Sequence, residues 1–164
     1  MKIEDLICKC DKNVDMDEYF EFRKKIIKDM PYPEWLRNRT NEEIISLLEN
    51  NSKLWVYYLN DEIVCSMMLI PADKELLEKY GLNSNDTISY GSMIVNPKYR
   101  GNGLQYQMLK VLDKCSKDLG YTLAIGTVHP DNIYSINNII KDKFVYIERR
   151  ILKSGIRDVY LKLL

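Results

Sequence analysis

The sequence predicts a mixed α/β (α+β) fold, in which helices and strands pack together. Segments whose apolar residues recur at helical spacing alternate along the chain with short segments rich in aromatic and β-branched residues. No internal repeat, low-complexity tract or linker interrupts this alternation. The chain has 164 residues, and domains most often hold about 100–150. We therefore expect one domain over residues 1–164.

Five helices are expected, and capping residues mark where two of them begin. A first amphipathic helix covers residues 14–30, with Asp15 or Asp17 as its N-cap. Thr40 and Glu43 form a capping box that starts a second, short helix. The remaining helices are expected at 73–80, ending at Gly81, at 104–119, followed by Gly120 as the C′ residue, and at 132–141.

Six strands are expected from composition and from the turns between them. Asn60-Asp61 is a candidate two-residue turn that joins two strands into a hairpin. Lys153-Ser154-Gly155 joins the last two strands. The expected strands cover 54–59, 62–70, 87–95, 121–128, 144–152 and 157–163.

The charge balance excludes several classes of partner. Lys and Arg together number 24, as do Asp and Glu, so the formal net charge is zero. A neutral chain gives no general reason to expect nucleic acid or an anionic membrane surface as a partner. It also carries little repulsion against self-association, so a homodimer is compatible with the sequence.

Neither the apolar runs nor the cysteines indicate a membrane or an oxidising compartment. The apolar run at 63–70 contains Ser66 and is far shorter than the ~20 residues that span a bilayer. The first residues include early acids and lack the apolar segment of a secretory signal. Four scattered cysteines, at positions 8, 10, 65 and 115, favour reduced thiols. We expect a cytoplasmic protein, and a single histidine, His129, argues against a metal site.

The most informative segment is the loop that joins the expected strand 87–95 to the helix after it. Arg100-Gly101-Asn102-Gly103 places two glycines at a helix start. A helix N-terminus presents unpaired backbone N–H groups and partial positive charge, and glycines let that backbone approach a phosphate closely. A plain tight turn explains the same residues. The Mg-nucleotide P-loop and the dinucleotide fingerprint are excluded, because the Gly-Lys-Ser/Thr ending and the third glycine are absent.

Residues 95–104 resemble the central motif of the GNAT superfamily of N-acetyltransferases. They read Val-Asn-Pro-Lys-Tyr-Arg-Gly-Asn-Gly-Leu, and the family pattern is Arg/Gln-x-x-Gly-x-Gly/Ala at the start of a long central helix. Arg100, Gly103 and the position of Gln105 match it in spacing. Gln105 departs from the usual Gly or Ala, and its larger side chain is expected to reshape one wall of the loop.

A second segment supports this resemblance. Residues 128–132, then Ser135 and Phe144, are similar to the family's second half, in which an Asn opens a short helix after a strand. Lys143-Phe144 stands where the family has Gly-Phe. The order of the expected elements also agrees from about residue 14 to the end of the sequence.

The resemblance implies a central mixed sheet that is splayed between two parallel strands, 88–95 and 121–128, with helices on its faces. It also implies acetyl-CoA as cosubstrate, with no metal. Lys98 and Arg100 are nearby cations for the CoA phosphates. The cofactor-binding residues that it implies fall into three groups: Met93, Ile94 and Val95 for pantetheine; the N–H groups of Gly101, Asn102, Gly103, Leu104, Gln105 and Tyr106 for the pyrophosphate; and Asn132 and Ser135 for the pantetheine arm or the thiol end.

The implied reaction is direct attack of a primary amine, on a small molecule or a peptide, on the thioester of acetyl-CoA. A backbone N–H near Ile94 would stabilise the oxyanion. Family members that modify protein N-termini often use a Glu and a Tyr for proton transfer, but the matching positions hold Thr127 and Ile139. The catalytic residues therefore stay open, and the candidates are Tyr90, Ser92, His129, Tyr134 and Glu148.

Substrate contacts are expected from the loop at 31–39. Aromatic residues could line an acceptor pocket, although strand alternation makes most of them core residues: Tyr32, Trp35, Trp55, Tyr57, Tyr58 and Tyr90. Two other interpretations remain open. One is a non-catalytic acyl-CoA-binding sensor or regulatory module, and the other is a structural domain in which the glycine loop is only a turn.

Overall fold

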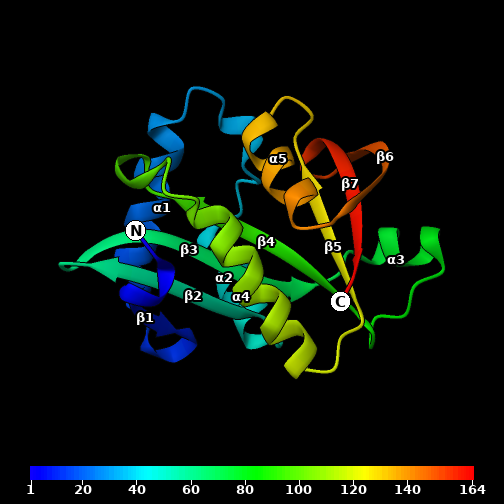
Figure 1. The fold of residues 1–164 in the computed structure, drawn as a ribbon, viewed down its shortest axis with the longest axis horizontal. Helices are drawn as coiled ribbons and strands as arrows, with labels where there is room; N and C mark the ends of the chain where they lie inside the picture. Colours follow the sequence, from blue (N-terminus) through cyan, green and yellow to red (C-terminus); the bar gives the residue numbers. More distant parts are fainter.

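A seven-stranded sheet runs through the molecule in the order β1-β2-β3-β4-β5-β7-β6 (Figure 1). The structure is a computed structural model that describes all 164 residues. Neighbouring strands are antiparallel except for β4 and β5, which are parallel. The strands are β1 (Ile7–Cys10), β2 (Lys53–Leu59), β3 (Glu62–Pro71), β4 (Thr87–Val95), β5 (Leu123–Val128), β6 (Val145–Leu152) and β7 (Gly155–Leu163).

The α-helices cover both faces of this sheet. They are α1 (Met16–Asp29), α2 (Asn41–Glu49), α3 (Lys74–Tyr80), α4 (Leu104–Asp118) and α5 (Ile133–Lys141). Short 3-10 turns precede three of them, η2 (Asp11–Asn13), η3 (Pro33–Trp35) and η4 (Pro97–Tyr99), and a fourth, η1 (Ile3–Asp5), precedes β1. The mixed α/β fold is confirmed, and every bound that was given for an expected helix or strand lies within two residues of the observed one. No helix is both long and apolar enough to cross a membrane.

The predicted caps and turns explain where these elements begin and end. Asp15 caps α1 by accepting a hydrogen bond from the Glu18 N–H at 3.1 Å. Thr40 and Glu43 form both bonds of the capping box at the start of α2. Asn60 and Asp61 both have positive φ, 48° and 61°, which is the geometry of a type I′ hairpin turn.

The core has two main layers, one on each face of the sheet. Residues that alternate along a strand enter opposite layers, as Leu54 and Trp55 do on β2. The larger layer of 18 buried residues packs against α4 and α5, and the smaller one of nine packs against α1 and α2. In Figure 1, α4 crosses the sheet on the near side. The helices thus pack on both faces of the sheet, and the site lies between two of its central strands, β4 and β5.

The two parallel strands separate halfway along their length. The strands β4 and β5 pair only over Thr87–Tyr90 and Leu123–Gly126, and beyond that point they diverge (Figure 1). The second half of β4 and the end of β5 therefore have unpaired edges that face each other. This is the splayed pair that the resemblance implied.

An irregularity in β4 begins where this separation begins. Gly91 pairs with Met68 of β3, but Ile94 pairs with Ser66, so β4 holds one more residue than β3 between these pairs. Ser92 has a φ of 49°, which a non-glycine residue rarely adopts. A bulge of this kind bends its strand and breaks the ladder, and it turns β4 away from β5.

Candidate active site

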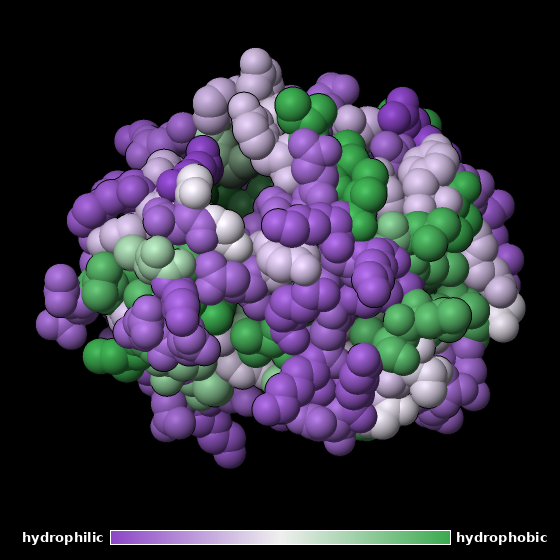
Figure 2. All heavy atoms as spheres, in the orientation of Figure 1, coloured by the Kyte–Doolittle hydropathy of each residue, from purple (hydrophilic) through white to green (hydrophobic).

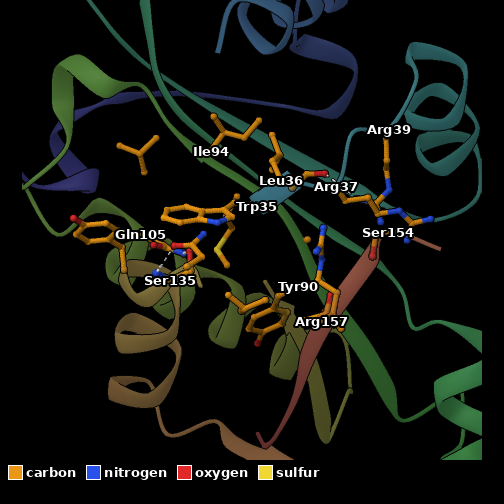
Figure 3. A pocket seen from close by; sticks show the side chains of 18 of the residues that line it. Trp35, Leu36, Arg37, Arg39, Tyr90, Ile94, Gln105, Ser135, Ser154 and Arg157 are labelled. Carbon is orange, nitrogen blue, oxygen red and sulfur yellow. Dashed lines mark hydrogen bonds between the residues drawn. The ribbon is translucent and has the colours of Figure 1, made fainter. Parts of the chain in front are cut away.

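A cavity of about 1770 Å³ opens where β4 and β5 diverge. Its walls come from the second half of β4, the start of α4, α5, the loop at 31–39 and the hairpin between β6 and β7. On the face drawn in Figure 2, a hollow with apolar walls opens between polar rims. Figure 3 shows two groups of side chains in this cavity, with Gln105 and Ser135 on one side and three arginines on the other. We call the side with Gln105, which includes the backbone of residues 101–106, the loop end, and the side with the three arginines the arginine end.

The loop end is formed by backbone rather than by side chains. The N–H groups of residues 101–106 donate to no acceptor in the chain, and the first N–H of this region that does is that of Gln107, to the Gly103 carbonyl. Gly101 and Gly103 have φ values of 81° and 68°, a backbone conformation that side chains disfavour. Six consecutive free donors at the positive end of a helix form a binding site for an anion.

Charged and amide side chains beside this loop are partly engaged elsewhere. Arg100 lines the cavity and forms no ion pair. Lys98 instead pairs with Glu62, and Asn102 donates to the Tyr99 carbonyl at 3.0 Å, so neither of these side chains lines the cavity. Tyr106 is also absent from the cavity wall, although its backbone belongs to the row of free N–H groups.

Gln105, which departs from the family pattern, joins α4 to α5. Its Nε2 donates to Ser135 Oγ at 2.9 Å, and its Oε1 accepts from Asn138 Nδ2 at 3.1 Å. Gln105 thus forms a wall of the cavity and anchors α5. Asn132 is the N-cap of α5, since its Oδ1 accepts from the Ser135 N–H at 3.1 Å, so that only the amide nitrogen of Asn132 is free to meet a ligand.

A close approach of backbone and side chain fixes the position of α5 over β5. A Cβ at Gly126 would lie only 2.5 Å from Ile139 Cδ1, so any larger residue there would displace the Ile139 side chain. This packing puts the N-terminus of α5 beside the end of β5. On the facing strand Met93, Ile94 and Val95 line the cavity, as do Asn132 and Ser135 of the α5 region.

Two of the five candidate catalytic residues lie outside the cavity wall. His129 is buried, and its Nδ1 accepts from the Asp131 N–H at 3.2 Å, which makes it part of the turn before α5. Glu148 lies on β6, where its Oε1 accepts from Tyr80 at 2.7 Å and from Arg150 at 3.4 Å. These bonds hold the pKa of Glu148 below its usual value.

The other three candidates line the cavity, but only one has a hydroxyl that makes no hydrogen bond within the chain. Tyr90 donates to Asp113 Oδ1 at 3.0 Å, and burial raises its pKa well above the ordinary value. Ser92 Oγ accepts from Arg39 Nη1 at 3.3 Å. Tyr134 is 68% exposed, and its hydroxyl forms no hydrogen bond with the chain. Among the three candidates in the cavity wall, Tyr134 is therefore the exposed residue whose hydroxyl has no partner in the chain.

The arginine end consists of Arg37, Arg39 and Arg157, which the sequence analysis did not single out. Arg37 and Arg39 come from the loop at 31–39, and Arg157 comes from β7. Figure 3 shows the three side chains close together beside Ser154. Burial, with repulsion from Arg37 and then Arg23, lowers the pKa of Arg39 to about 10. Burial and Arg37 also lower the pKa of Arg157.

The predicted aromatic pocket is only partly realised. Tyr32 and Trp35 line the cavity and stack with ring centroids 4.7 Å apart. Trp55, Tyr57 and Tyr58 are instead buried in the core and do not line it, as strand alternation favours. No group of three or more His, Cys, Asp and Glu side chains is arranged to hold a metal ion.

Comparisons with known proteins agree with this geometry. The family model described as "Acetyltransferase (GNAT) family" matches residues 16–139. An N-acetyltransferase from Staphylococcus aureus is similar in structure, with a TM-score of 0.72 at 18% identity over 96% of this chain and 98% of that one. A GNAT-family acetyltransferase from Streptococcus pneumoniae gives a TM-score of 0.74 at 16% identity over 97% and 99%.

A third similar structure contains a cofactor. This putative acetyltransferase from Salmonella typhimurium, solved with its cofactor acetyl-CoA, gives a TM-score of 0.71 at 12% identity over 97% of this chain and 94% of that one. A search of curated protein sequences finds no match. At such low identities the structures establish a shared fold, and the family model establishes the family.

Proposed function

Because the chain belongs to the GNAT family of acetyltransferases, we propose that it transfers the acetyl group of acetyl-CoA to the primary amine of a small molecule or peptide. The row of free N–H groups at residues 101–106, beside two splayed strands, is the observation that carries this proposal. Backbone donors at a helix N-terminus suit a pyrophosphate, and an unpaired strand edge suits the amides of pantetheine.

Each part of the cavity has a role in this proposal. The pyrophosphate accepts from the N–H groups of residues 101–106, and Arg100 adds a cation nearby. The pantetheine arm lies between β4 and β5, where Met93, Ile94 and Val95 offer backbone partners. The amide nitrogen of Asn132 is available to the same arm. The thioester then lies near the bulge at Ser92.

Acetyl-CoA supplies an activated acyl group, and the residues of the chain position the amine and handle charge and protons. The amine nitrogen forms a bond to the carbonyl carbon as the bond from that carbon to sulfur breaks. A backbone N–H near Ile94 faces the carbonyl oxygen and stabilises its developing negative charge. The attacking ammonium must first lose a proton to solvent, and the thiolate that leaves must gain one.

Tyr134 is the residue that we assign to protonation of the thiolate. Its hydroxyl is free, exposed and in the cavity wall, whereas that of Tyr90 is already donated to Asp113. The same shortage of proton-transferring side chains favours a second candidate function. A chain that binds acyl-CoA without turnover, as a sensor or regulator, needs the loop end but no free hydroxyl.

Two measurements on the purified chain test the proposal. Calorimetric titration with acetyl-CoA should give saturable binding with one site. Thiol release in the presence of a library of primary amines should then exceed the rate with acetyl-CoA alone. Binding without thiol release from any amine would favour the sensor. Absence of acetyl-CoA binding would contradict both functions.

A further inference from the structure

The arginine end is an unneutralised cluster of cations beside the reaction site. We infer that the amine acceptor carries an anionic group, a carboxylate or a phosphate, which Arg39 binds together with Arg37 and Arg157. This inference rests on the proposed acetyl transfer, and it names the chemical class of the acceptor. It excludes polyamines and other amines that carry only positive charge.

Arg39 is buried without a carboxylate. Arg39 is 8% exposed, and the only hydrogen bond of its side chain runs from Nη1 to Ser92 Oγ at 3.3 Å. It forms no ion pair. Burying an unpaired guanidinium is costly, because it gives up hydration without gaining a partner charge. Arg149 and Arg150 of the same chain show the usual solution, since both pair with carboxylates.

The neighbouring arginines increase this cost. Arg157 is 3% exposed and donates only to neutral backbone carbonyls, those of Ile156 at 2.7 Å and Glu34 at 2.9 Å. The side chain of Arg37 forms no hydrogen bond or ion pair, although Arg37 lines the cavity. Arg23, 3% exposed beneath this end, leaves both terminal nitrogens without a partner. After burial, the charge of Arg37 lowers the pKa of both Arg39 and Arg157, and an anion would relieve this repulsion.

No carboxylate in the same cavity forms an ion pair with the cluster, although Glu43 offsets part of the repulsion at Arg39. Glu43 accepts from the Thr40 N–H at 2.8 Å, and Asp73 accepts from the Glu75 N–H at 2.9 Å. Glu42, Glu43, Asp73 and Asp131 all line the cavity, and none forms an ion pair with an arginine. The arginines thus line a cavity that a ligand can enter, and Arg37 and Arg39 have side-chain donors without a carboxylate partner.

The position of Arg39 places the anion near the amine. Its bond to Ser92 ties the guanidinium to the bulge of β4, where the thioester lies in the proposed function. An acceptor whose anion is a few bonds from its amine can reach both, as α-amino acids and aminoalkyl phosphates do. The Tyr32–Trp35 stack offers an apolar wall for its hydrocarbon part.

Matched pairs of acceptors test the inference. The twenty common α-amino acids are compared with their α-carboxamides, phosphoethanolamine is compared with ethanolamine, and spermidine serves as the cationic amine. We expect thiol release with anionic acceptors and a rate at least about 100-fold lower for each neutral partner. The amino-acid and phosphate arms tell which anion is used. Equal or faster reaction of amides, ethanolamine or spermidine would overturn the inference while leaving acetyl transfer intact.

Variants identify the residue responsible. Arg39→Met should raise the KM for the anionic acceptor by about 100-fold and leave the KM for acetyl-CoA unchanged, and Arg39→Lys should recover part of this loss. Arg37→Met tests the half-buried arginine of the cluster in the same way, and it should also raise the KM for the anionic acceptor. Lys117→Met removes one exposed charge on α4, outside the cavity, and should change neither KM. An unchanged acceptor KM in both arginine variants would contradict the assignment.

A binding measurement separates this inference from the proposed function. Thermal melting is recorded with acetate, inorganic phosphate and acetamide, with sodium chloride matching the ionic strength. At least one anion should raise the melting temperature of the wild type more than that of Arg39→Met, in which only the loop end is left to bind an anion, and acetamide should have no effect. If acetyl-CoA fails to bind, acetyl transfer is refuted, and these melts still decide whether the arginine end binds anions. Equal shifts in wild type and variant would refute the anion site.

Discussion

The two ends of the cavity can each bind an anion, but one does so with backbone N–H groups and the other with arginine side chains. The loop end offers six backbone N–H groups and one nearby arginine from a continuous stretch of chain. The arginine end offers guanidinium groups from two segments more than a hundred residues apart in sequence. Backbone donors are neutral, so they do not lower the stability of the ligand-free protein. Buried cations do lower it, because they lose their hydration. The difference explains how a chain of zero net charge can offer two sites to anions.

The largest expected effect comes from a carboxylate placed at the loop end. Gly103→Glu puts a negative charge beside the free N–H groups. Like charges about 4 Å apart at an effective dielectric near 20 repel by about 4 kcal/mol, so acetyl-CoA should bind about 1000-fold more weakly in calorimetry. Gly120→Glu is the matched control, because Gly120 also has a positive φ, 88°, and lies beyond the opposite end of α4. Equal losses in both variants would mean that general backbone strain causes the effect.

The next effect concerns chemistry between the two ends. Tyr134→Phe should lower kcat by about 100-fold, the usual range for losing a general acid, and leave acetyl-CoA affinity unchanged. Stopped-flow thiol release and calorimetry measure the two quantities. Tyr146→Phe, at an exposed tyrosine of β6 outside the cavity, should leave both quantities at the wild-type value. A Tyr134→Phe enzyme with wild-type kcat would leave thiolate protonation to solvent.

The melting temperature should distinguish Arg39, which has no carboxylate partner, from Arg149, which has one. Arg39→Met should raise the melting temperature of the ligand-free protein by at least about 2 °C, the shift that 1 kcal/mol gives in a chain of this size, because it removes an unpaired buried charge. Arg149→Met should lower it, since Asp158, 4% exposed, loses its partner at 2.7 Å. Both measurements are made by calorimetric melting at neutral pH. A lower melting temperature for Arg39→Met would make Arg39 a structural residue.

The Arg39 effect should also depend on pH. The folded protein holds the pKa of Arg39 at about 10, below its ordinary value. Between these two values the unfolded chain binds more protons than the folded one, so the stability of the wild type rises with pH there. The advantage of Arg39→Met is therefore full below about pH 10 and shrinks above it. A constant difference across that range would contradict burial of a charged Arg39.

The smallest effect is expected at His129. Its Nδ1 already accepts from the Asp131 N–H, and the ring lies outside the cavity wall. His129→Ala should lose some stability with this turn, while the dependence of kcat on pH keeps its shape between about pH 5 and 8, where histidines ordinarily titrate. A lost or shifted limb of the profile would restore His129 as a base.

The loop end could be predicted because its signal is local. The glycines that permit the backbone conformation are adjacent in sequence to the helix that supplies the N–H groups, so Arg100–Leu104 carries the whole pattern. The caps at Asp15 and Thr40 were predicted for the same reason. Each feature depends on residues within one turn of the chain.

Features that depend on distant contacts escaped prediction. The strand β1 has only four residues, and its register with β2, such as Ile7 opposite Tyr58, is set by pairing rather than by its own pattern. Arg157 joins Arg37 and Arg39 only because β7 begins beside the loop at 31–39. The zero net charge hid this cluster, since composition does not record where charges gather.

A crystal structure of the protein with CoA and acetate tests both ends in one measurement. The account predicts pyrophosphate oxygens about 3 Å from the backbone nitrogens of residues 101–106 and an acetate carboxylate on the guanidinium of Arg39. Pyrophosphate bound away from this loop would contradict the backbone site. Acetate bound only elsewhere, with Arg39 still unpartnered, would contradict the anionic acceptor.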